Sequence, residues 1–309
     1  VVISNGNLLS FNPDFNSTVY SLVKSGTTLF AGGAFTVVNT VTRNRMAAIN
    51  TSNGNLVTTW DPNANSNIGK LLLDGTTIIA GGIFTRFKTV TRQYACAMLI
   101  STGEVNGWNP NPDYIVYETA YNSGHIYLGG GFHNVNGAAR NCIASFNIST
   151  GALESWNPLL TLNGSNTQGT VRSIVANSTD VYIGGNFDAS NGTSRINFAD
   201  AKVTDATLKN PNPAPDNFVY SIGLNGTQIV LGGQFIFLGR NGRGYGAGIR
   251  HSTGKVISFN PAADYIVYDI AHNTSKVYFV GLFDNAGGQS RTGAAAFNLS
   301  NGNLATWNA

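Results

Sequence analysis

Charged residues are scarce in this sequence, and glutamate is nearly absent. Asp, Glu, Lys and Arg make up 11% of the 309 residues, and glutamate occurs only as Glu104, Glu118 and Glu154. The 18 basic and 15 acidic side chains give a net charge of +3. A nucleic-acid-binding protein usually concentrates many more Lys and Arg on one face. We therefore expect no nucleic-acid partner.

Other absences narrow the class of protein further. The chain has two cysteines, Cys96 and Cys142, which are too few for a disulfide framework. No run of about 18 apolar residues occurs, so we expect no transmembrane segment. The four histidines show no metal-ligand spacing, and no calcium-loop signature appears. We expect neither a metal nor another cofactor.

What the sequence has in quantity is turn formers and β-branched residues. It contains 37 Gly, with abundant Asn, Ser and Thr, while good helix formers are few. Hydrophobic residues make up 42% of the chain, enough for a sizeable core. This composition is typical of short strands joined by many turns, so we expect an all-β fold.

A short motif, first seen as "LFAGGAF", occurs six times. Each copy ends on a Phe, has a Gly two positions earlier and an Arg eight positions later, and the copies are 49, 48, 55, 48 and 48 residues apart. The members are Phe35, Phe84, Phe132, Phe187, Phe235 and Phe283; Gly33, Gly82, Gly130, Gly185, Gly233 and Gly281; and Arg43, Arg92, Arg140, Arg195, Arg243 and Arg291. A nucleotide-binding loop would occur once, with a Lys or a helix behind it. Six copies at a nearly fixed period indicate architecture instead.

Each repeat is predicted to contain four short strands. In the first repeat these are residues 19–23, 28–35, 45–50 and 56–60, with tight Gly-containing turns between strands one and two and between strands three and four. Repeats end on an aromatic residue followed by Asn or Asp and usually Pro. These aromatic residues are Trp60, Trp108, Trp156, Phe259 and Trp307. The fourth repeat departs from the pattern, with residues 208–211 in place of the aromatic ending.

Four-stranded sheets that are apolar on both faces bury themselves by packing face to face in a ring, which is a β-propeller. The predicted fold is a single propeller domain over residues 1–309, with a partial repeat at 1–13 and full repeats at 14–62, 63–110, 111–158, 159–211, 212–261 and 262–309. A closed six-bladed ring is favoured, and a seven-bladed ring that lacks two strands stays open. The paired glycines would allow neighbouring groups to approach closely. Cys96 and Cys142 point the same way round the ring, which predicts two free, buried thiols.

The unit "GTTLFAGGAFTVVNTVTRNRMAAINTSNGNLVTTWDPNAN" resembles the delta-60 repeat, a propeller-forming repeat of large secreted and surface bacterial proteins. Kelch blades are similar in having a diglycine after the second strand. The resemblance extends over essentially the whole chain. It implies an extracellular or cell-surface location and membership of a larger chain or assembly, and it implies no particular activity.

The strand order places the long loops of every repeat at one edge and the tight turns at the opposite edge. Binding sites favour long loops on a rigid scaffold, so we place the candidate site at the long-loop edge. The six repeated Arg side chains are predicted to be structural, forking onto carbonyls or an Asp, with an anion or glycan clamp as the alternative. Binding candidates come from loops that differ between repeats. They are Arg86, Phe87, Lys88, His133, Asn163, Asn166, Phe237 and Tyr245. An aromatic residue beside a basic one suits a sugar or peptide contact and equally suits packing between blades.

We expect a non-enzymatic extracellular module for binding, adhesion or spacing, which presents its long loops to a glycan or protein partner. The alternatives are an enzyme acting on polysaccharide and a structural unit of a surface filament. Glycoside hydrolysis needs two carboxylates about 5–10 Å apart. Glu118 and Asp269 occupy equivalent first-strand positions three repeats apart, and a six-bladed ring would place them on opposite sides of its axis.

Overall fold

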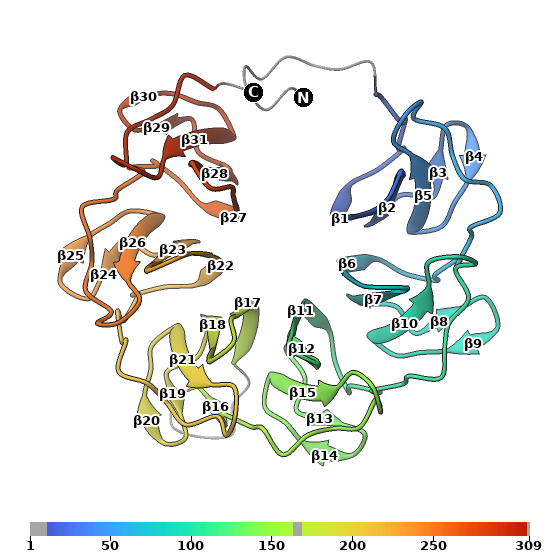
Figure 1. The fold of residues 1–309 in the computed structure, drawn as a ribbon, viewed down its shortest axis with the longest axis horizontal. Helices are drawn as coiled ribbons and strands as arrows, with labels where there is room; N and C mark the ends of the chain where they lie inside the picture. The colour runs from blue at the N-terminus through green and yellow to red at the C-terminus, as the bar shows by residue number, and fades with distance from the viewer. Residues whose placement is uncertain (1–10, 163–168, 308–309) are drawn as a thin grey trace. The chain divides into compact units, whose positions relative to one another are not determined.

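The chain is built of β-strands throughout the part that the structure describes. The structure is a computed structural model that describes residues 11–162 and 169–307. These residues form two compact units, 11–157 and 158–307, and each unit contains three of the predicted repeats (Figure 1). Across the described ranges no helix is long and apolar enough to cross a membrane.

Each repeat forms a three-stranded antiparallel sheet with its second strand in the middle. In residues 11–157 the sheets are β1 (Val19–Ser25), β2 (Thr28–Gly33) and β5 (Met46–Asn50); β6 (Ile68–Asp74), β7 (Thr77–Gly82) and β10 (Ala95–Leu99); and β11 (Val116–Asn122), β12 (His125–Gly130) and β15 (Ile143–Asn147). In residues 158–307 they are β17 (Thr170–Ala176), β18 (Asp180–Asn186) and β21 (Phe198–Lys202); β22 (Val219–Asn225), β23 (Gln228–Gly233) and β26 (Gly246–Arg250); and β27 (Val267–His272), β28 (Lys276–Gly281) and β31 (Ala294–Asn298). The predicted all-β repeat architecture is confirmed.

The predicted fourth strand is wrong, because it is reduced to a single bridge to the third strand. The bridges are Ile49–Leu56, Met98–Val105, Phe146–Leu153, Ala201–Leu208, Ile249–Val256 and Phe297–Leu304. In the first repeat, the backbone N–H of Trp60 donates to the Val57 carbonyl at 3.2 Å, which turns the chain away from the sheet. The turn directs the Trp60 ring into the core, where it meets Phe30 edge-on with ring centroids 5.0 Å apart. Packing of the aromatic ring therefore replaces further strand pairing.

The predicted long loop between the second and third strands is a small hairpin. The described hairpin strands are β3 (Val37–Val38) with β4 (Val41–Thr42), β8 (Arg86–Phe87) with β9 (Val90–Thr91), β13 (Asn134–Val135) with β14 (Ala138–Ala139), β19 (Ala189–Ser190) with β20 (Thr193–Ser194), β24 (Phe237–Leu238) with β25 (Asn241–Gly242), and β29 (Asn285–Ala286) with β30 (Gln289–Ser290). Segments that enter a repeat add to these hairpins, as in the bridge Phe15–Val38 and in β16 (Leu160–Thr161), which pairs with β19. We call this end of each sheet the loop edge and the opposite end, with its tight turns, the short-turn edge.

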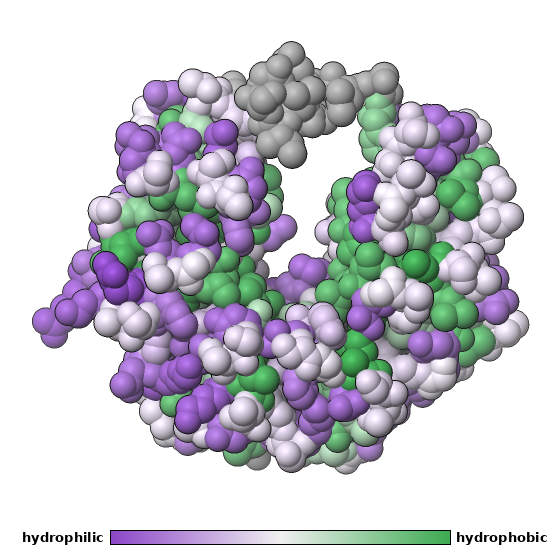
Figure 2. All heavy atoms as spheres, viewed as in Figure 1, coloured by the Kyte–Doolittle hydropathy of each residue, from purple (hydrophilic) through white to green (hydrophobic). Residues whose placement is uncertain are grey.

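The core lies between neighbouring sheets of a unit. One buried cluster joins Phe30 and Trp60 of the first repeat to Ile68 and Met98 of the second. Figure 1 shows the three sheets of residues 11–157 side by side in chain order, with β1, β6 and β11 along a common side. Hydrophobic side chains show in Figure 2 over the region where these strands lie, and Leu22 on β1 is 54% exposed.

Polar groups on the first strands tie neighbouring sheets together. Ser21 Oγ accepts a hydrogen bond at 2.9 Å from the N–H of Leu71 in the next repeat. The equivalent positions of the next two repeats form an ion pair, with Lys70 Nζ 3.0 Å from Glu118 Oε2. In the other unit, Ser221 Oγ accepts from the N–H of Ile270 at 3.0 Å. These side chains follow a β-bulge in each first strand, which turns them toward the next sheet.

The paired glycines are required by two close approaches. A Cβ on Gly32 would lie 2.7 Å from Cγ2 of Ile68 in the next sheet, so the first glycine permits face-to-face packing. A Cβ on Gly33 would lie 2.2 Å from the carbonyl oxygen of Thr18, so the second permits the bulged first strand to approach. Both contacts recur in the second unit at Gly184 and Gly185. The glycines are therefore needed for close packing.

Cys96 and Cys142 are buried thiols that form no disulfide, as predicted. Burial raises the pKa of the Cys96 thiol well above its ordinary value, against a smaller opposing effect of Arg92. Burial likewise raises the pKa of Cys142 to about 12. Both thiols are therefore uncharged core side chains at neutral pH.

We expect Gly33→Ala to lower the free energy of unfolding by roughly 3 kcal/mol, because the added methyl group overlaps the backbone carbonyl of Thr18. Chemical denaturation measures the change. Gly107→Ala is the control: an added Cβ there meets nothing within 4 Å, and the expected change is within about 0.5 kcal/mol. Equal stability of the two variants would contradict the packing role.

Candidate functional site

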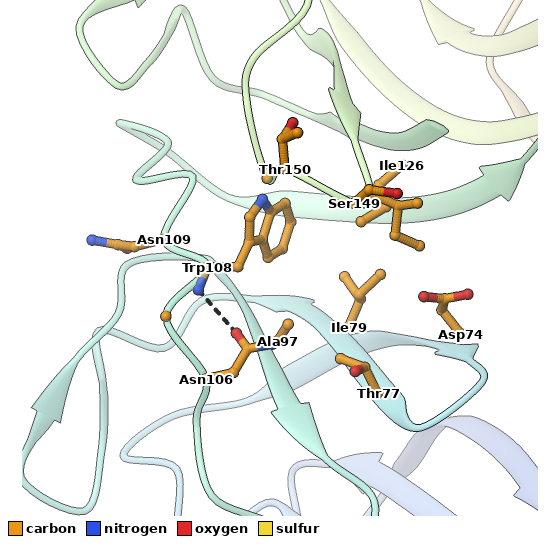
Figure 3. Close-up of a pocket in the computed structure, with 13 residues that line it drawn as sticks. Asp74, Thr77, Ile79, Ala97, Asn106, Trp108, Asn109, Ile126, Ser149 and Thr150 are labelled. Carbon is orange, nitrogen blue, oxygen red and sulfur yellow. Dashed lines mark hydrogen bonds between the residues drawn. The ribbon is translucent and has the colours of Figure 1, made fainter. Parts of the chain in front are cut away.

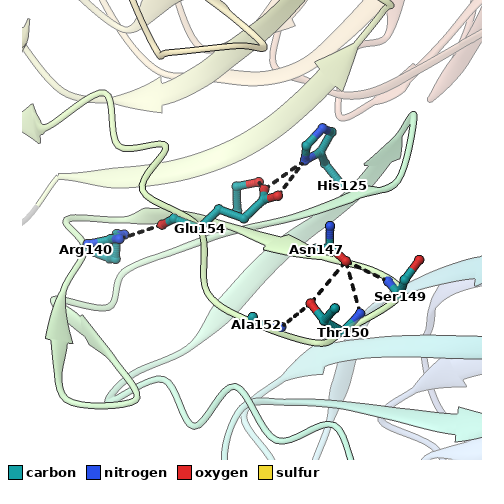
Figure 4. Close-up of polar contacts among 8 residues, drawn as sticks. His125, Arg140, Asn147, Ser149, Thr150, Ala152 and Glu154 are labelled. Atoms are coloured by element: carbon teal, nitrogen blue, oxygen red, sulfur yellow. Dashed lines mark hydrogen bonds and ion pairs between the residues drawn. The ribbon is translucent and has the colours of Figure 1, made fainter.

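The six repeated Arg side chains bind backbone carbonyls at the loop edge. In the first three repeats, one terminal nitrogen donates to the carbonyl of the preceding residue and the other to a carbonyl in the segment after the third strand. The bonds of Arg43 are to Thr42 (2.8 Å) and Thr58 (2.7 Å), those of Arg92 to Thr91 (2.9 Å) and Asn106 (2.8 Å), and those of Arg140 to Ala139 (2.8 Å) and Glu154 (2.6 Å). Arg195 repeats the pattern with Ser194 and Lys209. In these four repeats the guanidinium group links the hairpin to the end of its sheet, as Figure 4 shows for Arg140. Arg243 and Arg291 donate to the carbonyls of Gly242 (2.9 Å) and Ser290 (2.8 Å) within their own hairpins.

Arg140→Ala tests this fastening role. We expect a loss of about 1–2 kcal/mol in unfolding free energy, because two carbonyls lose a charged donor. Thermal and chemical denaturation would measure it, with Arg86→Ala, an exposed Arg at the same edge, as the neutral control. A variant that unfolds like the parent chain while losing affinity for a partner would assign Arg140 to binding instead.

Acidic and amide side chains at the loop edge hold the hairpins in place. Asp264 Oδ1 accepts from the N–H groups of Asp284 (2.9 Å) and Asn285 (3.0 Å). The side-chain amide of Asn285, followed by these backbone groups, holds the pKa of Asp264 below its ordinary value. Asn16, Asn65, Asp113 and Asp216 accept equivalent bonds in their repeats. The hairpins therefore form a stiff platform.

Two of the predicted binding residues, Arg86 and Lys88, line one cavity on this platform. The cavity has a volume of about 300 Å³, and Arg45 lies in its wall. The remaining lining residues are Asn44, Asn63, Ala64 and Asn65. We call this the cationic cavity, because three basic and no acidic side chains line it. The sequence pattern missed Arg45, which belongs to the preceding repeat.

Hydrogen bonds fix the wall of the cationic cavity, while the side chains of Arg86 and Lys88 stay exposed. Asn44 Nδ2 donates to Asn63 Oδ1 at 2.8 Å, and Asn65 Oδ1 accepts from the backbone N–H of Arg86 at 3.0 Å. The Arg45 guanidinium donates to the Ala34 carbonyl, which anchors it. The side chains of Arg86 and Lys88 are exposed, and in the ranges that the structure describes no ion pair joins either to an acid.

The other predicted binding residues do not gather at this cavity. The Phe87 ring is 1% exposed and meets Phe84 edge-on at 4.7 Å, so it packs in the core and is inaccessible to a partner. The backbone N–H of His133 donates to Asp113 Oδ1 at 2.8 Å. In the second unit, Phe237 on β24 is 49% exposed.

Tyr245, the remaining described candidate, is partly buried just before β26. Its ring centroid lies 5.8 Å from that of Tyr265. Asn163 and Asn166 lie outside the described residues.

The short-turn edge carries a cluster of polar side chains around Glu154. His125 Nδ1 lies 2.8 Å from Glu154 Oε2 (Figure 4). The same oxygen accepts from Ser145 Oγ. Aligning the repeats on their repeated Arg could have revealed this contact, because it places a Glu in the third repeat where the second repeat has an Asn. Glu154 follows Arg140 by 14 residues, where the second repeat has Asn106 after Arg92.

A second cavity opens at the short-turn edge of residues 11–157. Its volume is about 480 Å³, and its wall includes Asp74, Trp108, Asn109 and Thr150. Figure 3 shows the indole of Trp108 beside Thr150, with Asn106 Oδ1 accepting from the Trp108 backbone N–H at 2.9 Å. Within the described ranges no group of three or more His, Cys, Asp or Glu side chains is placed to hold a metal ion.

Comparisons with known proteins support the fold and leave the family open. No protein-family model matches the chain, and no curated protein sequence does. Among solved structures it is similar to the computationally designed protein Ika8, at 13% identity, with a TM-score of 0.59, over 93% of this chain and 86% of that one.

The chain is also similar to the extracellular domain of a putative hybrid two-component system from B. thetaiotaomicron. That likeness has 15% identity and a TM-score of 0.60 over 91% of this chain. A second structure, described as the extracellular domain of a putative one-component system from B. thetaiotaomicron, gives 14% identity and a TM-score of 0.59. This chain spans 32% of the length of either one. At such identities the likeness concerns the fold alone, an all-β repeat architecture.

Proposed function

We propose that this chain is a non-enzymatic extracellular binding module that contacts a glycan or protein partner at its loop edge. The observation that carries the proposal is the cationic cavity. Arg45, Arg86 and Lys88 surround about 300 Å³ of space with no acidic side chain among the lining residues. An anionic group on the partner, such as a carboxylate or sulfate, would supply the missing countercharge.

The polar groups of the cationic cavity favour an acidic glycan over an acidic protein segment. The amides of Asn44 and Asn63 in the cavity wall can donate to and accept from sugar hydroxyls. Arg86 and Lys88 are exposed and would bind a carboxylate or sulfate on the same saccharide. The stiff hairpins would hold these groups in place before binding, which lowers the entropy cost of association.

We also propose that the chain is extracellular and that it belongs to the delta-60 repeat family. Two of the similar structures are extracellular domains, and the sequence resembles delta-60 repeats. We propose that the six repeats are blades of one β-propeller, with a seven-bladed ring as the alternative; residues 1–10 of the partial repeat lie outside the described residues. Face-to-face packing of neighbouring sheets within each unit supports this, and a crystal structure would show whether the last repeat adjoins the first.

We propose no catalytic role for the carboxylates that the sequence raised for glycoside hydrolysis. Glu118 is ion-paired with Lys70 at 3.0 Å, and Asp269 accepts from Ser221 Oγ at 2.8 Å. Each carboxylate thus joins neighbouring sheets within its own unit. Because both carboxylates have structural roles, they favour a binding function for this chain over hydrolysis of a glycan.

The double variant Arg86→Ala/Lys88→Ala tests the cationic cavity. We expect it to weaken binding to acidic polysaccharides on a glycan array at least tenfold, since two cations are lost. Binding by the parent chain should also weaken as salt is added, because the contacts are exposed ion pairs.

Lys24→Ala is the control for net charge, because Lys24 is exposed at the short-turn edge of the same unit. It should bind like the parent chain. Retained affinity in the double variant, or binding confined to neutral glycans, would contradict this use of the cavity.

A further inference from the structure

The fourth repeat departs from the others at the short-turn edge. In the register set by the repeated Arg, Pro211 stands where other repeats carry the closing aromatic residue, and Asp200 stands where the second repeat carries Ala97. Pro211 also takes the place of the aromatic ring in the packing. A Cβ on Gly254 of the next repeat would lie 2.9 Å from Pro211 Cα. An equivalent glycine, Gly103, faces an indole ring instead.

Asp180, at the start of β18, is buried and ion-paired. It forms an ion pair with Lys209, accepts from Thr179 Oγ1 at 2.6 Å, and has His251 Nε2 at 3.4 Å from its Oδ2. Burial by itself raises the pKa of Asp180, but the hydrogen bond from Lys209 and the other contacts outweigh it and leave the pKa below its ordinary value. Asp180 is therefore ionised and neutralised by Lys209 at neutral pH.

Asp200 differs from Asp180 in that it is buried and receives no hydrogen bond from the described residues. Its side chain is 0% exposed, and neither carboxylate oxygen accepts a hydrogen bond from any described residue. Burial, and then the charge of Asp180, raise the pKa of Asp200 to about 7, against the opposing effects of Lys209 and Arg195. Native proteins seldom leave a buried acceptor unsatisfied, so this carboxylate calls for a donor from outside the chain.

A cavity of about 490 Å³ adjoins Asp200. Its wall holds Asp200, Lys209, Asn210, Pro211, His251 and Ser252. The side chains of Lys209 and His251 are 33% and 28% exposed, so both are accessible to a ligand. Both side chains also contact Asp180, and they line the same cavity as Asp200, which is large enough for one small molecule.

We infer that this cavity binds one neutral sugar residue, whose neighbouring hydroxyls donate to Asp200 and accept from Lys209 and Asn210. A hydroxyl both donates and accepts, so a diol matches a wall that mixes an unsatisfied acceptor with donors. An anion would meet the carboxylate of Asp200, and a cation would meet Lys209. The site belongs to the second unit and the cationic cavity to the first, and this inference does not depend on the proposed function.

The test is a calorimetric titration of the full chain with D-glucose, D-galactose, D-mannose and N-acetylglucosamine, with galacturonate and glucosamine as charged comparisons. At least one neutral sugar should bind, and Asp200→Ala should bind it at least tenfold more weakly. That variant should fold, since the equivalent position in the second repeat is Ala97. Asp205→Ala, at an exposed acid of the same repeat, is the matched control and should bind like the parent chain.

The dependence on pH separates direct contact from a structural role. Asp180, Lys209, Arg195, His251 and the Tyr182 hydroxyl are the charged or titratable groups around Asp200. Only an ionised Asp200 accepts from two hydroxyls, so affinity should rise several-fold between about pH 5.5 and about pH 8.5. Asp200→Asn should remove this rise, whereas a pH effect that came from His251 would remain.

Three results would overturn the inference. They are no binding of any neutral sugar, equal affinity in Asp200→Ala and the parent chain, and binding of only the charged sugars. Acidic-glycan binding through Arg86 and Lys88 should be unchanged in the Asp200 variants, so failure at one site is distinguishable from failure at the other.

Discussion

Close approach between neighbouring sheets is the constraint on which the rest of each unit depends. The sheets pack face to face because Gly32 and Gly33 lack a Cβ, which admits Ile68 from the next sheet and the Thr18 carbonyl from the first strand. Any side chain at either glycine would separate these surfaces. The strand order of each sheet places its hairpin at one edge and its tight turns at the other.

The loop edge combines a repeated hydrogen-bonded framework with side chains that differ between repeats. At the loop edge, repeated Arg, Asp and Asn side chains use their hydrogen bonds on backbone groups, as Arg140 and Asp264 do. The hairpins are thereby stiff, and the binding role that we propose falls to side chains between them, such as Arg86 and Lys88. A rigid platform with variable side chains is a general solution for binding modules.

At the short-turn edge, the third and fourth repeats carry three carboxylates, Glu154, Asp180 and Asp200. Two of them have a partner: Glu154 meets His125, and Asp180 meets Lys209. Asp200 is the exception, with both carboxylate oxygens unpaired among the described residues. A local departure from an otherwise consistent repeat, made at a cost in stability, is the pattern expected where function overrides folding.

The sequence by itself determined the all-β class, the six-fold repetition and the turn positions, because period and turn chemistry are local. Gly26 and Gly54, for instance, adopt the left-handed conformation that their turns require. Tertiary structure alone decided which side chains meet. Phe87 packs in the core, Arg45 lines a cavity with Arg86 of the next repeat, and no described residue donates to Asp200. Each outcome depends on a neighbouring strand or sheet, and a repeat period does not specify which side chains that neighbour brings into contact.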